Sequence, residues 1–534
     1  MDGEHSSRRG EAKVELGRRR RRPARRTWVI VTAAAMSLLG LSWVFTNPPG
    51  GSPDEAANYV RAMGTAFGQF VPRPSRPIDF ISTDPKLQRF NRIVVGSFTL
   101  PARYVQDSRW GCTDTVPPKA AVCLRAPLRD GGQRGSGSQV VTSYVAFYPP
   151  VVFFLEGLGG RLTPNDHDAL YAGRLVDLAL AVALLSVALA VSRGRWIMVG
   201  LLASVSPMVI FLASSLNPSS VEIAAGIAFA ASLLALNRDD PNGFTWWAVQ
   251  VSGVLLAVAR QVGPVWVLLD ALAVVLLMGP RTASALVRRQ PVQSGLAVTA
   301  VALASLSTVI WDAVIGHAAK GTWHDTMAGI GPSFGQLQGL VDQFVGVFGW
   351  ASVQMPEGVV LGTLVGYGAL IVASLAYGDW RARGVLIGVG VVAVLVAVVL
   401  NAATQMPFGF TVQARYVMPL TALLLIMAGW IVERRPRART GTHFPQHSRT
   451  EALRVPPTVL AALVGLAGLQ FVGWLWNSRV SAVGPHGSWD FITHALWAPP
   501  GGWLLWTLTA VAGTLLLTVG IVALVGNDSA PARL

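Results

Sequence analysis

The sequence predicts an all-α polytopic membrane protein with about twelve transmembrane helices. Of its 534 residues, 52% are hydrophobic and only 13% are charged, and the mean hydropathy is +0.47. A soluble globular chain carries about 25% charged residues. The net charge of +15 could suggest nucleic acid, but the basic residues cluster in short segments between apolar runs, as in the cytoplasmic loops of membrane proteins. We therefore expect a membrane protein with no nucleic-acid partner.

About twelve apolar runs approach the ~20 residues that a helix needs to cross the hydrocarbon core. The first run follows a long basic segment and lacks a small-residue cleavage site, so we interpret it as an uncleaved helix and not as a signal peptide. The runs cover residues 28–46, 169–191, 196–212, 219–236, 244–259, 263–278, 293–315, 358–377, 384–402, 416–432, 457–476 and 503–525.

Basic loops predict the direction in which the chain crosses the membrane. If the N-terminus is cytoplasmic, the even-numbered runs should end in basic loops, and they end at Arg193, Arg238, Arg288, Arg381 and Arg434. We expect an N-in/C-in, multi-pass protein of the plasma (inner) membrane.

The predicted division of the chain has six parts. They are a basic cytoplasmic tail (1–26), a first transmembrane helix (27–46), an extracytoplasmic loop with a surface helix and a re-entrant segment (47–168), a transmembrane core (169–432), a cytoplasmic polar insert (433–455) and a C-terminal transmembrane pair (456–534).

The large loop 47–168 contains both cysteines, Cys112 and Cys123. Because they are close in sequence and expected in an oxidising compartment, we predict a structural disulfide between them. Two free thiols are the alternative. A metal site is disfavoured because the loop offers few soft ligands.

The start of this loop has the pattern of a helix N-terminus. Ser52 suits the N-cap, Pro53 the first helical position, and Glu55 the third position of a capping box. Apolar residues then recur at helical spacing over 56–70, which predicts an amphipathic helix on the outer membrane surface. On this interpretation Asp54 only complements the helix dipole.

Two other segments lie outside the apolar runs. The stretch FYPP at 147–150 has adjacent prolines and cannot form an ordinary span, so we expect a broken or re-entrant element that lines a cavity. Residues 334–350 are predicted to form a second surface helix or a simple connector.

Polar residues gather at the outer ends of several runs. Each alone is more often a satisfied interhelical contact than a ligand contact, but ionisable residues in spans mark functional cavities. Together they suit a reaction on an anionic, lipid-linked substrate, because arginine binds phosphate oxygens bidentately and a carboxylate can deprotonate a hydroxyl or hold a divalent cation. These residues are Arg174, Asp177, Asn217, Glu222, Arg260, Gln261, Asp312, His317, Arg415 and Tyr416.

Five stretches in the same order resemble a predicted-membrane-protein family catalogued as a domain of unknown function (number twenty-one forty-two). They are NPPGGSPDEAANYVRA, SYVAFYPPVVFF, ASSLNPSS, GVFGWASVQMPEG and VQARYVMPLTALLL. That family looks like a branch of the GT-C glycosyltransferase superfamily, whose members take sugars from polyprenyl-phosphate carriers on the outer side of the membrane. The family pattern has a histidine three residues after the glutamate, where this chain has Asn58.

The resemblance implies a GT-C-like fold and roles for several residues. Asp54 is the expected general base or metal ligand, with Glu55 as its alternative, and the implied cofactor is a divalent cation (Mg²⁺ or Mn²⁺) or none. Arg415 is expected to bind the donor phosphate, with Arg260 second. The other expected substrate-binding residues are Tyr416, Gln261, Asn217, Tyr144 and Tyr148.

Two classes of function compete. The first is a glycosyltransferase that uses a polyprenyl-phosphate-linked sugar and an extracytoplasmic glycan or glycolipid acceptor within a lipid membrane. The alternative is a transporter or lipid flippase, which many spans and buried charges would also suit. It is disfavoured because the ionisable residues crowd one face, with Asp270 the main deeper exception, and because no internal repeat is evident. A scaffold that binds lipid without chemistry stays open because of Asn58.

Overall fold

The computed structural model describes residues 25–74, 84–113, 119–125, 137–237, 241–317, 321–434 and 455–528. The predicted basic tail and the predicted polar insert lie almost entirely outside the described residues. The described chain is mostly helical, as expected of a membrane protein with this composition.

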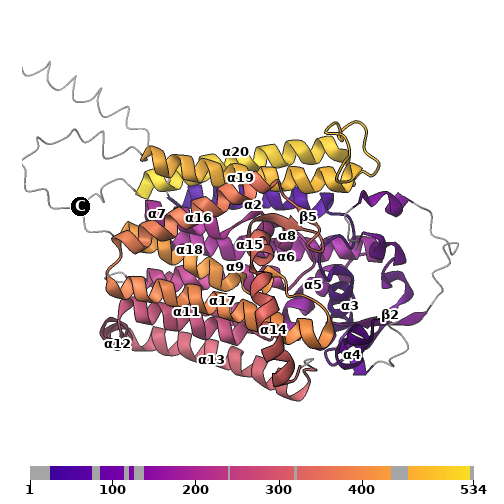
Figure 1. Ribbon diagram of the computed structural model, residues 1–534, viewed down its shortest axis with the longest axis horizontal. Coiled ribbons are helices and arrows are strands. Elements are labelled where there is room, and N and C mark those ends of the chain that lie inside the picture. Colours follow the sequence, from indigo (N-terminus) through magenta and orange to yellow (C-terminus); the bar gives the residue numbers. More distant parts are fainter. Residues whose placement is uncertain are drawn as a thin grey trace, which may run out of the picture.

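Within the described residues, seven helices are long and apolar enough to cross a membrane. In Figure 1 the long helices run roughly along the horizontal axis, with α19 and α20 on one edge and α13 on the opposite edge. The seven are α2 (Arg25–Thr46), α6 (Asp166–Val191), α13 (Pro291–Val314), α16 (Glu357–Tyr377), α17 (Trp380–Phe408), α19 (Pro457–Val483) and α20 (Gly502–Asp528).

Two further apolar segments are bent. The axes of α7 (Arg195–Ser204) and α8 (Pro207–Ala213) meet at 58°, and those of α11 (Gly263–Met278) and α12 (Pro280–Arg289) at 102°. Proline begins the second helix of each pair, where its missing N–H is tolerated. Between α11 and α12, Gly279 has a φ of 90°, which favours glycine.

Three shorter apolar helices complete the bundle. They are α9 (Ser219–Ala235), α10 (Gly243–Ala259) and α18 (Met418–Glu433). Every predicted span falls on one of these helices or bent pairs. With each bent pair counted as one span, up to nine segments of the described chain are long and apolar enough to cross a membrane. The number that cross the membrane and the direction in which they cross stay predictions.

The shorter helix α9 lies at the centre of the bundle. All its residues except Leu233 are buried, and it packs on α6, α10 and α18. Its alanines, glycine and serines let neighbouring helices approach closely. By contrast, α13 exposes large apolar side chains such as Leu296, Val298 and Leu303, which suits contact with lipid.

The two ends of the bundle differ. At one end, Arg25 donates to the carbonyl oxygens of Leu189 and Ala190, and Arg434 donates to that of Asn237. These arginines cap helix C-termini, where positive charge is favourable. They belong to the segments predicted to be cytoplasmic.

The other end carries a small packed subdomain, which we call the end subdomain (residues 47–165). In Figure 1 it lies on the right, where α3, α4, α5 and β2 are labelled. Its elements are α3 (Glu55–Ala66), β1 (Arg73–Pro74), α4 (Pro85–Val94), β2 (Gly96–Pro101), the 3₁₀ helices η2 (Ala102–Tyr104), η3 (Ser108–Cys112) and η4 (Ala121–Arg125), β3 (Ser138–Ser143) and α5 (Pro150–Arg161).

The end subdomain contains a small sheet, so the all-α expectation is wrong in this detail. The strands are antiparallel in the order β1-β2-β3, and β2 pairs with β3 in the register Phe98↔Val141 and Leu100↔Gln139. Phe98 and Leu100 alternate along β2 and are buried against α3. This alternation is the signature of a half-buried strand.

The predicted surface helix is also corrected. In α3 every residue except Ala56 is buried, because the helix packs against α5 on one side and against β2 and β3 on another. Tyr59, Val60 and Met63 belong to the aromatic core of the end subdomain. The periodic apolar residues of α3 therefore face protein, and its other residues are covered as well.

The two cysteines are joined. Cys112 in η3 and Cys123 in η4 form a disulfide with a Cα–Cα distance of 6.3 Å. It fixes the segment that carries Trp110, whose carbonyl oxygen lies so close to Gly50 that a Cβ there would sit 2.3 Å away.

The second predicted surface helix, at 334–350, has a different form. The chain forms α14 (Trp323–Gly335), α15 (Leu337–Gly346) and a two-stranded hairpin of β4 (Val347–Phe348) and β5 (Val353–Gln354). Phe348 is fully buried against Trp43 and Phe211. The hairpin is therefore part of the core and not a surface connector.

Candidate active site

The candidate site forms around Asp54, the residue directly before α3. Asp54 has a φ of 61°, and no side chain caps the helix. This left-handed conformation is uncommon for residues other than glycine, although aspartate tolerates it better than most. Ala351 is the other described non-glycine residue with a positive φ. Because backbone strain of this kind collects at functional sites, the conformation suggests a role for Asp54 beyond helix capping.

The predicted capping box at this position is wrong. Ser52 does not precede the helix directly, and its buried hydroxyl has no hydrogen-bond partner within the described ranges. The carboxylate of Glu55 instead accepts hydrogen bonds from the backbone N–H groups of Gly50, at 3.0 Å, and Leu216, at 3.1 Å. A buried arginine draws Glu55 away from the helix start.

Glu55 forms an ion pair with that arginine, Arg174 of α6. Nε and Nη2 of Arg174 donate to the two carboxylate oxygens at 2.7 and 2.6 Å. The guanidinium also donates to the carbonyl oxygens of Val44, Asn47 and Pro48. Both side chains are 0% exposed. This sealed pair fixes the turn between α2 and α3 and leaves Glu55 no access to a substrate.

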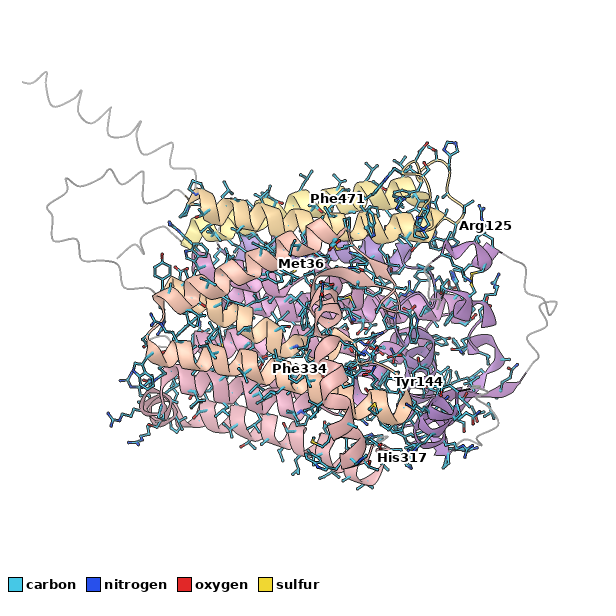
Figure 2. The ribbon with its side chains drawn as sticks, in the orientation of Figure 1. Met36, Arg125, Tyr144, His317, Phe334 and Phe471 are labelled. Carbon is cyan, nitrogen blue, oxygen red and sulfur yellow. A yellow bond between two sulfur atoms is a disulfide. The ribbon has the colours of Figure 1, made fainter. Side chains whose placement is uncertain are left out.

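Asp54 forms a second ion pair, with Arg415 in the 3₁₀ turn η5 (Ala414–Tyr416). Nη2 of Arg415 donates to Oδ2 of Asp54 at 2.5 Å, and Nη1 donates to the carbonyl oxygen of Pro53 at 3.3 Å. The Tyr144 hydroxyl donates to Oδ1 of Asp54 at 2.9 Å. Figure 2 labels Tyr144 where the end subdomain meets the helix bundle. The Asp54 side chain is 18% exposed and that of Arg415 is 4% exposed, so this pair is open on the carboxylate side.

Arg260, between α10 and α11, has its own buried carboxylate. Nη1 of Arg260 donates to Oε2 of Glu222 at 3.2 Å and to the hydroxyl of Ser219 at 3.3 Å. Trp266 donates from Nε1 to the other oxygen of Glu222 at 3.0 Å. Burial lowers the pKa of Arg260, but Glu222 and nearby tyrosines outweigh this effect and raise the pKa overall. Arg260 is therefore a permanent cation with a fixed counter-ion.

Two tyrosine rings border these arginines. Cζ of Arg260 lies 4.3 Å from the ring centroid of Tyr416, and Cζ of Arg415 lies 5.3 Å from the same centroid. Cζ of Arg260 is also 5.6 Å from the ring centroid of Tyr148. Burial raises the pKa of Tyr148, so its hydroxyl stays protonated. The shared ring of Tyr416 brings both cations into one cluster.

The turn that carries Tyr148 is held from two sides. Arg61 of α3 donates to the carbonyl oxygen of Tyr148 at 2.7 Å, and Trp311 of α13 donates to that of Phe147 at 2.9 Å. Burial lowers the pKa of Arg61 to about 9, and the group remains charged at neutral pH. The predicted broken segment is therefore a clamped turn before α5, and it presents Tyr148 to Arg260.

Two other predicted residues have supporting positions. Asn217 donates its backbone N–H to Asp177 at 2.9 Å and its side-chain amide to the carbonyl oxygen of Pro53 at 3.0 Å. It thus fixes the turn that leads into Asp54. Gln261 is half-buried in the connection between α10 and α11, close to Asp312 of α13. Within the described residues, its side chain forms no hydrogen bond with Arg260 or Arg415.

The residues present do not fit a divalent cation. Among the described residues, no group of three or more His, Cys, Asp or Glu side chains is arranged to hold a metal ion. Asp54 already faces Arg415 and the hydroxyl of Tyr144, and a neighbouring positive charge opposes a second cation. Asn58, at the position of the family histidine, is buried and donates its amide to the carbonyl oxygen of Leu216 at 3.0 Å.

Two charged residues near the cluster, Arg61 and Glu156, were not among the predicted site residues. Glu156 of α5 is fully buried, and neither of its carboxylate oxygens has a hydrogen-bond partner among the described residues. A lone glutamate in the apolar stretch FFLEGLGG was the available signal for Glu156. The sequence did not single out Arg61, because a charged residue is ordinary on a helix that was expected at the surface.

The structure brings most of the predicted site residues into one cluster, which we call the arginine–carboxylate cluster. It excludes Glu55, and it uses Asn217 as a support. Its members are Asp54, Tyr144, Tyr148, Arg260, Arg415 and Tyr416, with Glu222 as the counter-ion of Arg260.

Two solved structures show a low-level likeness to the chain. One is ArnT from Cupriavidus metallidurans bound to undecaprenyl phosphate, with 13% identity and a TM-score of 0.37 over 95% of this chain and 78% of that chain. The other is the same protein in the apo state, with 15% identity and a TM-score of 0.30 over 72% of this chain and 67% of that chain. At TM-scores this low, neither likeness carries a structural argument. No curated protein matches the sequence.

Unlike the two structures, a family model shows to which family the chain belongs. Residues 37–424 match the family described as Predicted membrane protein (DUF2142). The match includes the second half of α2, the end subdomain and the helices up to the first part of α18, and therefore all members of the arginine–carboxylate cluster. The chain belongs to this family.

Proposed function

We propose that this member of the DUF2142 family is an integral-membrane glycosyltransferase. It moves a sugar from a polyprenyl-phosphate carrier to a glycan or glycolipid acceptor of the cell envelope, on the extracytoplasmic side of the plasma (inner) membrane. The observation that carries the proposal is one partly exposed carboxylate, Asp54, beside two arginines, Arg415 and Arg260, at one end of a membrane helix bundle.

The two arginines suit the phosphate of the donor. A guanidinium presents a planar fork of N–H donors that matches phosphate oxygens. Arg260 is oriented by Glu222 and Ser219, and Arg415 by the carbonyl oxygen of Pro53. The end of the bundle that holds both residues is the end predicted to face outward, where lipid-linked sugars would be met.

Asp54 suits the role of general base. As the acceptor hydroxyl oxygen attacks the anomeric carbon, Asp54 takes the hydroxyl proton. The bond between the anomeric carbon and the phosphate oxygen breaks, and polyprenyl phosphate leaves with the electron pair. The arginines stabilise the negative charge on the departing phosphate. Direct attack inverts the configuration at the anomeric carbon.

One observation favours the transporter or flippase alternative. Asp270 of α11 is fully buried, and neither of its carboxylate oxygens has a hydrogen-bond partner among the residues that the structure describes. Unpaired carboxyl groups within membrane helices often mark ion or proton pathways. Asp270 lies on the apolar helix α11, and within the described residues it forms no hydrogen bond with a member of the arginine–carboxylate cluster.

The two functions differ in what happens to the donor. Purified protein in proteoliposomes is supplied with a radiolabelled polyprenyl-phosphate sugar and an envelope-lipid extract. A transferase forms labelled acceptor and releases polyprenyl phosphate in equal amounts, and Asp270→Asn leaves the rate unchanged. A flippase moves intact donor between leaflets, and Asp270→Asn stops that movement. Intact donor that crosses the bilayer without any labelled acceptor would reject the transferase proposal.

A further inference from the structure

The guanidinium of Arg415 has two candidate anions. In the structure, Nη2 is bonded to Asp54 and Nη1 to the carbonyl oxygen of Pro53, while the buried Nε has no hydrogen-bond partner in the described part of the chain. The proposed function requires the same guanidinium for the donor phosphate. It also requires Asp54 to accept a proton, although Arg415 and Tyr144 now occupy its two carboxylate oxygens.

The other carboxylate of the cluster, that of Glu222, cannot be displaced from its arginine. Glu222 is fully buried on the central helix α9, and its two oxygens are held by Arg260 and by the indole N–H of Trp266. Removing a buried carboxylate from its partners strands a charge at high cost. Arg260 therefore keeps Glu222 whether or not a ligand is present.

Asp54 can give way. Its side chain is 18% exposed, so its carboxylate can be solvated when it leaves Arg415. A single nitrogen of Arg415 bonds it, in contrast to the two that bond Glu55 to Arg174. The Tyr144 hydroxyl bonds the oxygen that Arg415 does not use, and can keep the carboxylate near the site after the ion pair opens.

We infer that the donor phosphate displaces the carboxylate of Asp54 from Arg415 and so releases Asp54 to act as the base. This inference rests on the proposed function. Before the donor binds, the ion pair keeps both groups inactive. When it binds, one anion replaces another on the same guanidinium, and Asp54 remains beside Tyr144 with a free oxygen. The donor therefore binds first, and the acceptor hydroxyl is activated only in its presence.

The inference predicts that a variant without the competing carboxylate binds the carrier more tightly. The affinity of a site that is open for a fraction of the time is reduced by that fraction. Asp54→Asn keeps the hydrogen bond to Tyr144 and tolerates the left-handed backbone, but it removes the charge that holds Arg415. We expect the dissociation constant for sugar-free polyprenyl phosphate, measured in nanodiscs, to fall about tenfold. Asp54→Gly, which suits a positive φ, should give the same result if the asparagine variant folds poorly.

A double-mutant cycle separates displacement from simple charge repulsion. In an Arg415→Ala background, Asp54→Asn should no longer tighten binding, because there is no guanidinium left to compete for. Repulsion alone would survive in that background and would overturn the inference. Asp379→Asn is the matched control, because Asp379 caps α17 and asparagine caps equally well; it should leave binding unchanged.

The remaining outcomes are also decisive. If the parent protein binds polyprenyl phosphate and Asp54→Asn binds it equally or more weakly, the ion pair is permanent and the inference is overturned, while the proposed function stands. If the parent protein shows no saturable binding, the proposed function is overturned and the inference with it.

Discussion

Asp54 and Glu55 are consecutive residues, yet their carboxylates enter two different kinds of ion pair. Glu55 is bonded through both oxygens to Arg174, and both side chains are 0% exposed. Asp54 is bonded through one oxygen to Arg415 and is 18% exposed. Backbone carbonyl and N–H groups also bond Arg174 and Glu55. In the open pair, Nε of Arg415 has no hydrogen-bond partner among the described residues, and solvent reaches the carboxylate of Asp54. We therefore propose that completeness of bonding, more than charge, separates the structural carboxylate of Glu55 from the proposed catalytic carboxylate of Asp54.

The largest expected effect tests the open pair. Asp54→Asn keeps the size and the hydrogen bonding of the side chain but removes the basic carboxylate. Loss of a general base costs about 10² to 10⁴ in rate, so sugar transfer from a polyprenyl-phosphate donor should be lost in membranes with matched expression. The midpoint of thermal unfolding should stay near the parental value. Transfer at the parental rate would mean that the open pair is structural too.

The next effect tests the sealed pair. Arg174→Met has a similar length but leaves Glu55 as an uncompensated buried charge, which costs about 3–5 kcal/mol of unfolding free energy. Denaturant or thermal unfolding in detergent measures this loss. Arg415→Met is the control, since Asp54 can turn to solvent, and it should destabilise the protein far less. Equal destabilisation by the two variants would remove the distinction between the pairs.

A smaller effect tests the cationic side of the open pair. Arg415→Ala should weaken binding of polyprenyl phosphate by about one to two decades, because a charge-assisted hydrogen bond is worth about 1.5–3 kcal/mol. Arg439→Ala serves as the control; Arg439 belongs to the predicted cytoplasmic insert, outside the described residues. Equal affinities of the two variants for the carrier would refute the assignment of Arg415.

The smallest effect concerns the hydroxyl that holds Asp54. Tyr144→Phe removes one hydrogen bond, worth about 0.5–1.5 kcal/mol, so kcat should fall by up to about tenfold, with unfolding unchanged. Tyr59→Phe is the matched control: its hydroxyl bonds the carbonyl oxygen of Tyr104 in the core of the end subdomain. That variant should lower stability and leave kcat unaltered. The opposite result for the two tyrosines would contradict the functional role of Tyr144.

Much of the membrane bundle could be predicted because it depends on local properties of the sequence. Apolar runs and basic loops are read directly from the chain, and each predicted span falls on a helix. The approximate position of the site could also be predicted from local features of the sequence. Polar residues at the ends of apolar runs are costly unless they meet one another, and Arg260, Glu222, Arg415 and Asp54 do meet.

The details of the end subdomain could not be predicted in this way. The helical periodicity of α3 was correct, but periodicity does not tell whether the polar face meets water or protein. Here α5 and the sheet cover it. The capping box failed because Arg174, 119 residues away from Glu55, competes for its carboxylate. Such long-range contacts outweigh local preferences for helix capping, and they cannot be predicted from a short stretch of sequence.

The sequence separation of the ion pairs has a consequence for how the protein is made. Partners are 119 residues apart in the pair of Glu55 and Arg174, 38 apart in that of Glu222 and Arg260, and 361 apart in that of Asp54 and Arg415. Because a ribosome delivers the N-terminal part first, the sealed pair can close as soon as α6 has emerged, and Arg260 can meet Glu222 soon afterwards. The ion pair of Asp54 and Arg415 can form only after most of the chain has been inserted. A nascent chain therefore builds the scaffold around the site well before the residue that completes it is translated.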